Sequence, residues 1–271
     1  MSVFGTSWGD YSAQAGTWAM GAGMWDNMIA YETPSFAGFK VFAQYGMGNQ
    51  VSDEYNVNGV DVEKKWGEEN ESSSDRYYAI GASYNNGPLS LYFAVDSINY
   101  SSESLVSNTT TGATQFGDQD DSLTVTFGGN YDFEVVKLYA GAQYFDEIKT
   151  SKMKGVIQDV DKFNSGASVG FADRMKGWSI GVSAGIPAAG GTVMVGAAYL
   201  DAEAADSESS EATPDDELTR WIVSAGYDYP FSKRTDVYGV VTYNQDSIDN
   251  VGAQDVDPSV WGVMIGLRHR F

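Results

Sequence analysis

Few side chains in this sequence combine into groups that could catalyse a reaction or hold a metal ion. The chain has no cysteine and one histidine, His269, close to its last residue, so it offers neither a thiol nucleophile nor a histidine–cysteine metal site. A Ser-His-Asp triad would depend on that same histidine. The acidic stretches lack EF-hand spacing, and no phosphate-binding loop of the G-x-x-x-x-G-K-[ST] type occurs. The sequence therefore predicts no enzymatic activity, no cofactor and no metal site.

The charged side chains can still act as fixed charges, and they fall into two groups. Four acidic stretches, 47–74, 100–121, 201–217 and 245–257, carry net charges of −5, −4, −8 and −4, which together equal the −21 of the whole chain. Several basic residues occur singly, at alternating positions opposite apolar neighbours. They are Lys40, Lys137, Arg220, Arg268 and Arg270. Because so acidic a chain repels polyanions, we expect no nucleic-acid partner.

Alternation of apolar and polar residues runs along most of the chain and predicts the strands that position these charges. Strands in soluble proteins are usually about 5–6 residues long, whereas a strand that crosses a bilayer at a tilt needs about 9–11. Most of the expected strands reach the longer value. The eleven expected strands span 26–32, 36–46, 75–85, 88–99, 121–132, 135–146, 175–186, 190–201, 218–229, 232–244 and 258–271.

The connections between these segments alternate in length. Short turns are expected at 33–35, 86–88, 133–134, 187–190 and 230–232. Long polar loops are expected at 47–74, 100–120, 147–174, 202–217 and 245–257. A meander with short turns at one end and long loops at the other is typical of outer-membrane barrels. No run of 18 apolar residues predicts a membrane helix, and the first residues lack the pattern of a signal peptide.

The alternation also predicts two chemically different faces. Apolar side chains, with aromatic ones near the strand ends, should point outward, and small or hydroxyl side chains should point inward. The outward set is Tyr78, Leu91, Leu138, Val182, Val195, Val223 and Val241, and the inward set is Ser83, Thr126, Gly141 and Ser183. A soluble sheet with one wet face alternates in the same way. A soluble ligand-binding β-barrel is therefore an alternative, although strand length and the asymmetric connections favour a membrane barrel.

Three stretches resemble the trimeric general porins of Gram-negative outer membranes. The segment NMIAYETPSFAGFKVFAQYG (27–46) is similar to the hairpin that follows the constriction loop in that family. The segments YDYPFSKRTDVYGVVTYN (227–244) and GLRHRF (266–271) resemble its penultimate hairpin and its terminal strand. The resemblance covers about residues 20–271. It implies a homotrimer surrounded by outer-membrane lipid and lipopolysaccharide, with a water-filled channel for small hydrophilic solutes and ions.

The resemblance also implies a fold class and a division of the chain. The class is all-β, an antiparallel up-and-down transmembrane β-barrel with 11–12 strands in this chain. The family barrel has sixteen strands, so residues 26–271 would be its C-terminal part. Residues 1–25 would then be a remnant of the constriction loop, and the N-terminal strands would be missing. Alternatively, residues 1–12 supply a twelfth strand and close a smaller barrel.

Candidate site residues follow from the same resemblance. In the family, carboxylates on the constriction loop face basic residues on the pore wall. Asp10 would lie in that loop, Asp26 near its exit and Glu32 on the inward side of the first strand. They would face the five inward bases given above. Phe271 would be the C-terminal aromatic residue that the outer-membrane assembly machinery reads.

Two properties of the channel are also expected. Acidic loops at the pore mouth should concentrate cations, so the channel should prefer them. A substrate-selective sugar channel is the main alternative, because inward aromatic residues could form a track. Those residues are Phe42, Tyr92, Tyr139 and Tyr238.

Overall fold

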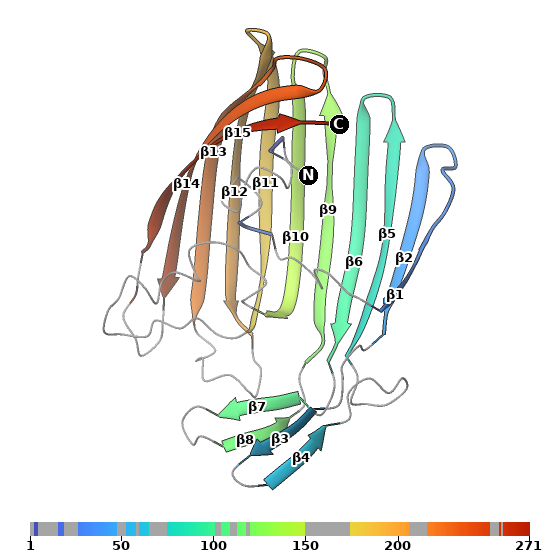
Figure 1. The fold of residues 1–271 in the computed structure, drawn as a ribbon, viewed down its shortest axis with the longest axis vertical. Helices are drawn as coiled ribbons and strands as arrows, with labels where there is room; N and C mark the ends of the chain where they lie inside the picture. The colour runs from blue at the N-terminus through green and yellow to red at the C-terminus, as the bar shows by residue number, and fades with distance from the viewer. Residues whose placement is uncertain are drawn as a thin grey trace.

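Eleven long strands dominate the described part of the chain and form a single sheet (Figure 1). The computed structural model describes residues 3–4, 16–18, 27–47, 53–57, 60–64, 75–100, 104–108, 113–117, 120–149, 174–205, 216–249, 255 and 257–271. The strands of the sheet are β1 (Met28–Glu32), β2 (Phe39–Gly46), β5 (Arg76–Asn86), β6 (Leu89–Asn99), β9 (Ser122–Asp132), β10 (Lys137–Lys149), β11 (Arg174–Ala188), β12 (Gly191–Ala204), β13 (Glu217–Pro230), β14 (Thr235–Asp249) and β15 (Ser259–His269). In the described residues we find no helix long and apolar enough to span a membrane.

The sheet is an antiparallel meander in which each strand pairs with the next strand of the sheet along the chain. Short turns join strand pairs at one end, which is uppermost in Figure 1, and the long connections leave the other end. We call these the turn end and the loop end. All eleven strands expected from the alternation are present. Gly38 shows why one short turn needs glycine: its φ is +87°, and a Cβ there would lie 2.3 Å from the Asn85 carbonyl oxygen.

Several strands extend further toward the loop end than the sequence predicted. The strands expected at 135–146, 190–201 and 232–244 continue to Lys149, Ala204 and Asp249. The apolar pattern fades at those points because acidic residues enter it. Backbone pairing nevertheless continues, as in the Glu203–Glu217 and Arg220–Asp246 pairs. Part of the acidic charge assigned to the loops therefore lies on strands.

Two small hairpins interrupt connections that were expected to be loops without strands. They consist of β3 (Asp53–Val57) with β4 (Val60–Lys64), and β7 (Ser104–Asn108) with β8 (Ala113–Gly117). Both lie below the loop end in Figure 1. The first hairpin flanks Asn58 and Gly59, the dipeptide favoured in two-residue hairpin turns. The expectation of strand-free connections was wrong here.

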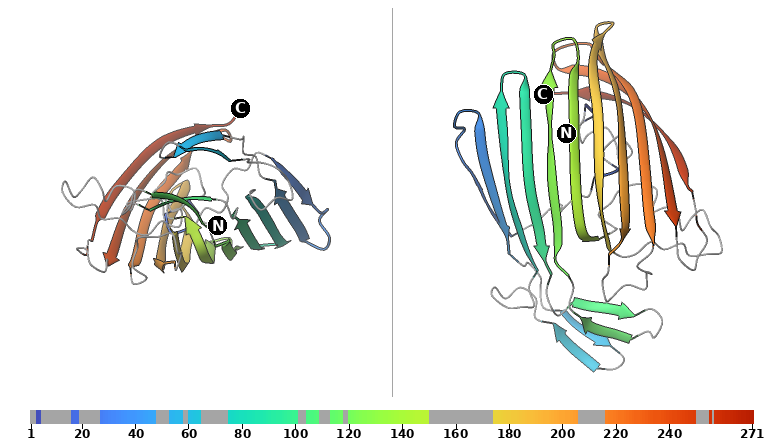
Figure 2. Two further views of the ribbon diagram at one scale, coloured as in Figure 1. Left: turned by 90° about the horizontal axis from the view of Figure 1, so that it is seen from below. Right: turned by 180° about the vertical axis from the view of Figure 1, so that it is seen from behind.

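The sheet does not close on itself. Its strand order begins with β1 and ends with β15, which are not paired with each other. Seen from below, the sheet forms an open arch (Figure 2). This agrees with the gap expected between the first and last strands. Of the first twelve residues the structure describes Val3 and Phe4, which lie in a turn and form no strand beside β15.

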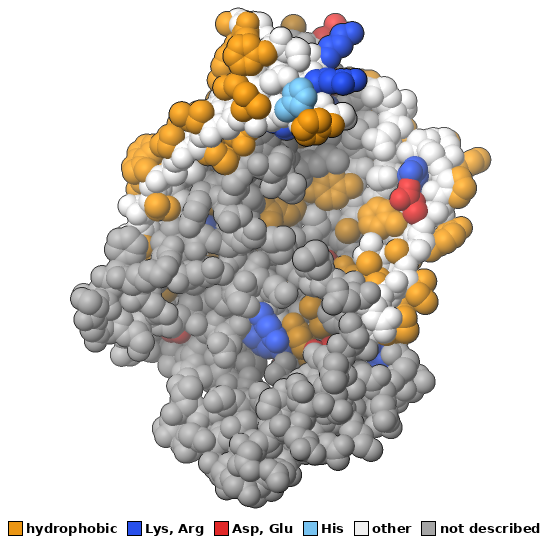
Figure 3. All heavy atoms as spheres, viewed as in Figure 1, with side chains coloured by type: hydrophobic (Ala, Val, Ile, Leu, Met, Phe, Trp, Pro, Cys, Tyr) orange, Lys and Arg blue, Asp and Glu red, His pale blue; other side chains and the backbone are white. Residues whose placement is uncertain are grey.

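The convex face of the arch is apolar and exposed, and the concave face carries polar side chains together with two buried apolar clusters. Val182 and Ile265 expose 58% and 79% of their surface on the convex face. Ser183 and Thr242 are buried on the concave face. The predicted outward and inward sets are confirmed, with Leu91 lying among outward side chains beside Phe127 and Leu138. In Figure 3 hydrophobic side chains gather along both margins of the described sheet.

Aromatic side chains form two rows on the convex face. The row near the loop end is Tyr45, Tyr78, Tyr144, Trp178, Tyr199, Trp221, Tyr243 and Trp261, and the row near the turn end is Phe39, Tyr84, Tyr131, Phe133, Tyr229 and Phe231. Several neighbouring rings are in contact, as between Tyr243 and Trp261, whose centroids lie 4.8 Å apart. Trp221 and Tyr229 are eight positions apart on β13, which is about 26 Å along a strand at about 3.3 Å per residue. A strand tilt of about 40° reduces this to about 20 Å, close to the apolar band of a membrane barrel.

The convex face should tolerate charge only near its margins. Val223 lies mid-way along β13 on this face, and Thr219 lies on the same face nearer the loop end. In the full-length protein, Val223→Arg should lower the free energy of unfolding by about 2–4 kcal/mol, and the control Thr219→Arg by about 0–1 kcal/mol. Urea unfolding in lipid vesicles measures both. Equal losses for the two variants would contradict a lipid-facing convex surface.

Candidate functional site on the concave face

Hydroxyl, amide and glycine positions cover most of the concave face at mid-height. The Gln143 Nε2 atom donates a hydrogen bond to Thr126 Oγ1 at 3.0 Å between β10 and β9. The Ser224 and Thr242 hydroxyls lie 2.7 Å apart between β13 and β14. These pairs place polar atoms where the alternation requires inward side chains. At these positions the concave face presents groups that water can solvate, unlike the convex face.

Arg220 forms the most deeply buried ion pair in the described part of the chain. Its Nε and Nη2 atoms donate to the Asp246 Oδ1 and Oδ2 atoms, each at 2.6 Å. Both side chains are fully buried, and the two residues are direct partners across β13 and β14. The remaining Arg220 nitrogen, Nη1, donates to the Gly16 carbonyl oxygen at 2.7 Å. The guanidinium thus fixes structure and does not project as an isolated charge.

The described residues of the N-terminal segment lie against the concave face. The Val3 amide donates to Ser183 Oγ at 3.0 Å. Phe4 is fully buried and packs in one cluster with Met194, Ile222 and Val240. The structure therefore places a short part of residues 1–25 on the face where a constriction loop was expected.

The candidate acids of this segment cannot be located. Asp10 and Asp26 both lie outside the described residues. Glu32 is described at the end of β1, and Lys40 Nζ donates to its Oε1 atom. The Glu32 side chain is 58% exposed and the Lys40 side chain is 42% exposed. This pair is therefore accessible to solvent, in contrast to the Arg220–Asp246 pair.

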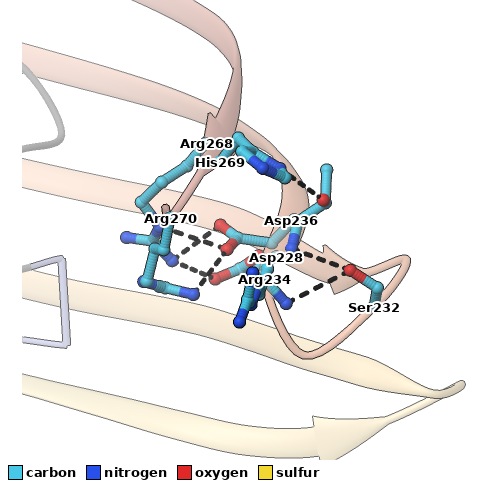
Figure 4. A network of polar contacts seen from close by, with 8 residues as sticks. Asp228, Ser232, Arg234, Asp236, Arg268, His269 and Arg270 are labelled. Atoms are coloured by element: carbon cyan, nitrogen blue, oxygen red, sulfur yellow. Dashed lines mark hydrogen bonds and ion pairs between the residues drawn. The ribbon is translucent and has the colours of Figure 1, made fainter.

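Arg268 and Arg270 meet two carboxylates near the turn end (Figure 4). The Arg268 Nη2 atom lies 3.2 Å from Asp228 Oδ2 and 2.7 Å from Asp236 Oδ2. Arg270 Nη1 lies 3.2 Å from Asp236 Oδ1. All four side chains share the concave parity of β13, β14 and the end of β15. Both arginines are therefore neutralised locally by carboxylates.

The SKRT stretch supports this cluster from the adjoining turn. Ser232 Oγ accepts hydrogen bonds from the Arg234 and Thr235 amides, each at 3.1 Å. Thr235 Oγ1 lies 2.8 Å from His269 Nδ1, and the Arg270 amide donates to the Arg234 carbonyl oxygen at 2.9 Å. The motif therefore ties the last strand to the β13–β14 turn. His269 has a hydrogen-bonding role here, on the outward parity expected for it.

Lys137 is the remaining candidate base, and it lies beside an aromatic ring. Its Nζ atom is 5.6 Å from the centroid of Tyr139, within the range of a cation–π contact. Three acids that the sequence reasoning did not single out, Asp228, Asp236 and Asp246, now account for much of the inner charge. Asp246 could have been found by continuing the alternation of 232–244 for two more residues, because Arg220 then faces it across the ladder.

The four aromatic residues of the expected sugar track are spread over the wall. Phe42, Tyr92 and Tyr238 each lie directly opposite a glycine in the ladder, namely Gly81, Gly128 and Gly266. A Cβ on any of these glycines would lie 2.4–2.7 Å from the facing aromatic side chain. The rings thus lie in notches left by the glycines. Tyr139 is the fourth residue, and no ring contact joins any two of these four described residues.

Arg174 braces the loop end of the sheet. It is almost fully buried, and its Nη1 atom donates to the carbonyl oxygens of Asp120 at 2.8 Å and Glu147 at 3.1 Å. Its guanidinium carbon lies 4.3 Å from the ring centroid of Tyr100. Burial raises the pKa of the Tyr100 hydroxyl. Arg174 therefore joins both ends of the β6–β9 connection to the end of β10. The sequence reasoning missed it because it lies one residue before the expected strand.

Comparison with known proteins decides the family. The family model described as Gram-negative porin matches residues 1–249. The chain belongs to the Gram-negative porin family. An outer membrane porin protein of Bordetella pertussis is 30% identical to this porin over 99% of the chain and 63% of the relative. Outer membrane porin protein 32 of Delftia acidovorans is 27% identical over 94% of the chain and 60% of the relative.

Solved porin structures share the fold. The anion-selective porin from Comamonas acidovorans has a TM-score of 0.54 and 22% identity, with 94% of this chain and 64% of that chain covered. OmpT of Vibrio cholerae has a TM-score of 0.54 and 16% identity, with 90% and 64% covered. This porin chain thus spans less than two thirds of the length of these relatives. The family, the barrel-type all-β fold and the outer-membrane location expected from the sequence are confirmed, and the soluble alternative is wrong.

The two kinds of inner ion pair should differ in their effect on stability. Asp246→Ala leaves Arg220 buried without its partner, which should cost about 3–5 kcal/mol of unfolding free energy. Glu32→Ala removes an exposed partner of Lys40 and should cost less than about 1 kcal/mol. Urea unfolding of the full-length porin measures both variants. If Asp246→Ala proved as mild as Glu32→Ala, the Arg220 pair would not be an important structural contact.

Proposed function

We propose that the whole protein is an outer-membrane channel through which ions and small hydrophilic solutes diffuse passively. The observation that carries this proposal is the two-faced sheet, with exposed apolar side chains on its convex side and polar, hydrogen-bonded side chains on its concave side. The concave groups described above are fixed charges, hydroxyls and amides. They suit the solvation of passing solutes and form no arrangement of nucleophile and base.

A channel of this kind requires closure of the sheet in the whole protein. Each unpaired backbone group at a strand edge costs several kcal/mol in lipid, and β1 and β15 both present such edges. We propose that further strands fill the gap and that residues 26–271 are the C-terminal part of a larger barrel. We also propose a homotrimer among lipid and lipopolysaccharide. The trimer form of Vibrio cholerae OmpT, which shares the fold, supports this assembly.

Residues 1–25 are proposed to act as the constriction loop, with Asp10 and Asp26 as its acids. The support comes from the described residues of this segment, Val3, Phe4 and Gly16, which contact the concave wall. Lys40, Lys137, Arg220, Arg268 and Arg270 are proposed to line the pore on the opposite wall. Of these, Arg220 serves mainly to hold structure, because its charge is paired and buried.

The proposed channel prefers cations. The net charge is −21, and the inner bases Lys40, Arg220, Arg268 and Arg270 each have a carboxylate partner. Because these pairs cancel locally, the unbalanced acids toward the loop end dominate the field at the pore mouth. The anion-selective porin of Comamonas acidovorans shares the fold, but a fold does not fix the charges on a pore wall.

Reversal potentials across planar bilayers test the preference. The full-length porin should favour cations at low salt, because the Debye length is about 30 Å at 0.01 M. The preference should weaken toward 1 M, where that length is about 3 Å. An anion preference at low salt would contradict the proposal. A cation preference that stayed constant with salt would place the selecting charges inside the pore and not at its mouth.

Phe271 is proposed to be the assembly signal. It follows the end of β15 fully exposed, and its ring packs edge-on against His269 at 5.0 Å. Phe271→Ala should slow insertion into the outer membrane, whereas Phe231→Ala, which removes another exposed aromatic near the turn end, should insert normally. Pulse-labelled chains and the heat-resistant folded band on gels give the rates. Equal rates for both variants would remove Phe271 from this role.

A further inference from the structure

Two bases of the SKRT stretch, Lys233 and Arg234, take no part in the ion pairs of the concave face. Both are exposed in the turn between β13 and β14. Among the described residues, Arg234 is engaged through its backbone, which donates to Ser232 Oγ and accepts from the Arg270 amide (Figure 4). Lys233 forms no ion pair with any described residue. Both cationic groups are therefore available to a ligand outside the chain.

Strand pairing brings further basic residues beside this turn. The Arg270 amide donates to the Arg234 carbonyl oxygen, and His269 is the ladder partner of Thr235. Four basic side chains lie in these two segments, opposed by the two carboxylates of the cluster described above and by the terminal carboxylate of Phe271. The positive charge therefore exceeds the negative charge here, in contrast to the acidic loop end.

The other short turns at this end carry no basic residue. The turns at 33–38, 87–88, 133–136 and 189–190 contain neither lysine nor arginine. The strand bases nearest to the turn end, Lys40 and Lys137, have inward parity. In Figure 3 basic side chains gather around the histidine at the upper margin of the molecule. Within the described sheet, the exposed positive charge of the turn end is thus concentrated at one turn.

Exposed aromatic side chains lie on the outward side of the same turn. Tyr229 is 40% exposed and Phe231 is 66% exposed, and their rings pack edge-on with centroids 5.4 Å apart. The exposed ring of Phe271 packs against His269 nearby. Because aromatic side chains collect at the membrane–water interface, the two bases lie at the depth of lipid headgroups. A soluble polyanion would gain nothing from these rings.

The headgroup phosphates of phospholipids suit this combination of groups. The short turns of outer-membrane barrels lie on the periplasmic side, where the membrane leaflet consists of phospholipids. Clustered bases beside a membrane bind anionic headgroups, and the long side chains of lysine and arginine can extend along apolar surface to reach them. A guanidinium group also donates two parallel hydrogen bonds to phosphate oxygens.

We propose that Lys233 and Arg234, with the rings of Tyr229 and Phe231 beside them, bind the headgroup of an anionic phospholipid in the periplasmic leaflet. We call these four residues the rim site. The bases contact the phosphate, and the rings lie against the first part of the acyl chains. The site is on the outer rim of the sheet, so this inference goes beyond the proposed channel and does not depend on conduction through the concave side.

Competition between two phospholipids tests the rim site. The full-length porin is reconstituted at 0.01 M salt in nanodiscs of equal parts phosphatidylglycerol and phosphatidylcholine. The lipids that stay bound after transfer to detergent are counted by mass spectrometry. One base near a membrane surface strengthens the binding of anionic lipid by roughly fivefold. The first bound lipid should therefore be phosphatidylglycerol by roughly tenfold, and Lys233→Gln/Arg234→Gln should lower that ratio at least fivefold.

A matched control removes two bases from the opposite end of the sheet. Arg76 and Lys176 have outward parity at the loop end. Lys176 Nζ lies 3.4 Å from Glu203 Oε1, in a ladder row that continues through Glu217 and Asp249. These acids repel anionic lipid, so Arg76→Gln/Lys176→Gln should keep the wild-type ratio. An equal loss in both double variants would assign the preference to net charge and overturn the rim site.

Salt provides a test that needs no substitution. The preference of the wild-type porin for phosphatidylglycerol should disappear toward 1 M salt, where the Debye length falls to about 3 Å. A preference that persists there would contradict a headgroup held by exposed bases. If the double variant does not give the heat-resistant folded band, the single variant Lys233→Gln should still lower the ratio, though by less.

The remaining outcomes separate the rim site from other roles of this porin. Equal retention of the two lipids by the wild type, or a wild-type ratio in the folded glutamine variant, would overturn the inference. Binding to isolated peptidoglycan that requires the same two bases, without a lipid preference, would assign them to the cell wall instead. A wild-type protein that retains phosphatidylglycerol but conducts no ions would refute the channel function and leave the rim site in place.

Discussion

The absence of water in the hydrocarbon of a bilayer is the constraint from which the rest of this structure follows. Every backbone amide and carbonyl group there needs a partner within the protein. The sheet meets this need across eleven strands through continuous antiparallel ladders, and the period of two then separates an apolar convex face from a polar concave one. The aromatic rows mark where the hydrocarbon gives way to the interface. In the described sheet, the outer edges of β1 and β15 are where backbone groups still lack partners from a neighbouring strand.

Charge on the concave face is largely balanced within that face. Arg220 with Asp246, Lys40 with Glu32, and Arg268 and Arg270 with Asp228 and Asp236 form local pairs. These ion pairs differ in burial, and they therefore differ in role. The enclosed Arg220 pair fixes geometry and holds the Gly16 carbonyl oxygen, whereas the Lys40 and Arg268 pairs remain partly exposed to solvent. In the proposed channel, selection by sign is therefore left mainly to the unbalanced acids.

The sequence predicted the features that depend on period two and on connection length. These are the eleven strands, their outward and inward faces, the open edges and the family. It did not predict features that depend on contacts across the ladder or from distant segments. Asp246 was assigned to a loop because hydropathy fades after Tyr243, although backbone pairing does not require apolar side chains. Met194 and Ile222 were simply inward positions until Phe4 covered them, and Gly141 and Gly196 gave no sign of which rings would fill their space.

Solute flux tests the central claim, passive diffusion through the concave face, most directly. The full-length porin should be placed in liposomes and their swelling followed with neutral sugars of increasing size. The account predicts rates that rise linearly with sugar concentration and fall smoothly with molecular size, because width and charge alone select. Saturation of the rate at low concentration, with one sugar strongly preferred over others of equal size, would contradict it and favour a substrate-selective channel. Absence of swelling with every sugar and salt would contradict channel function altogether.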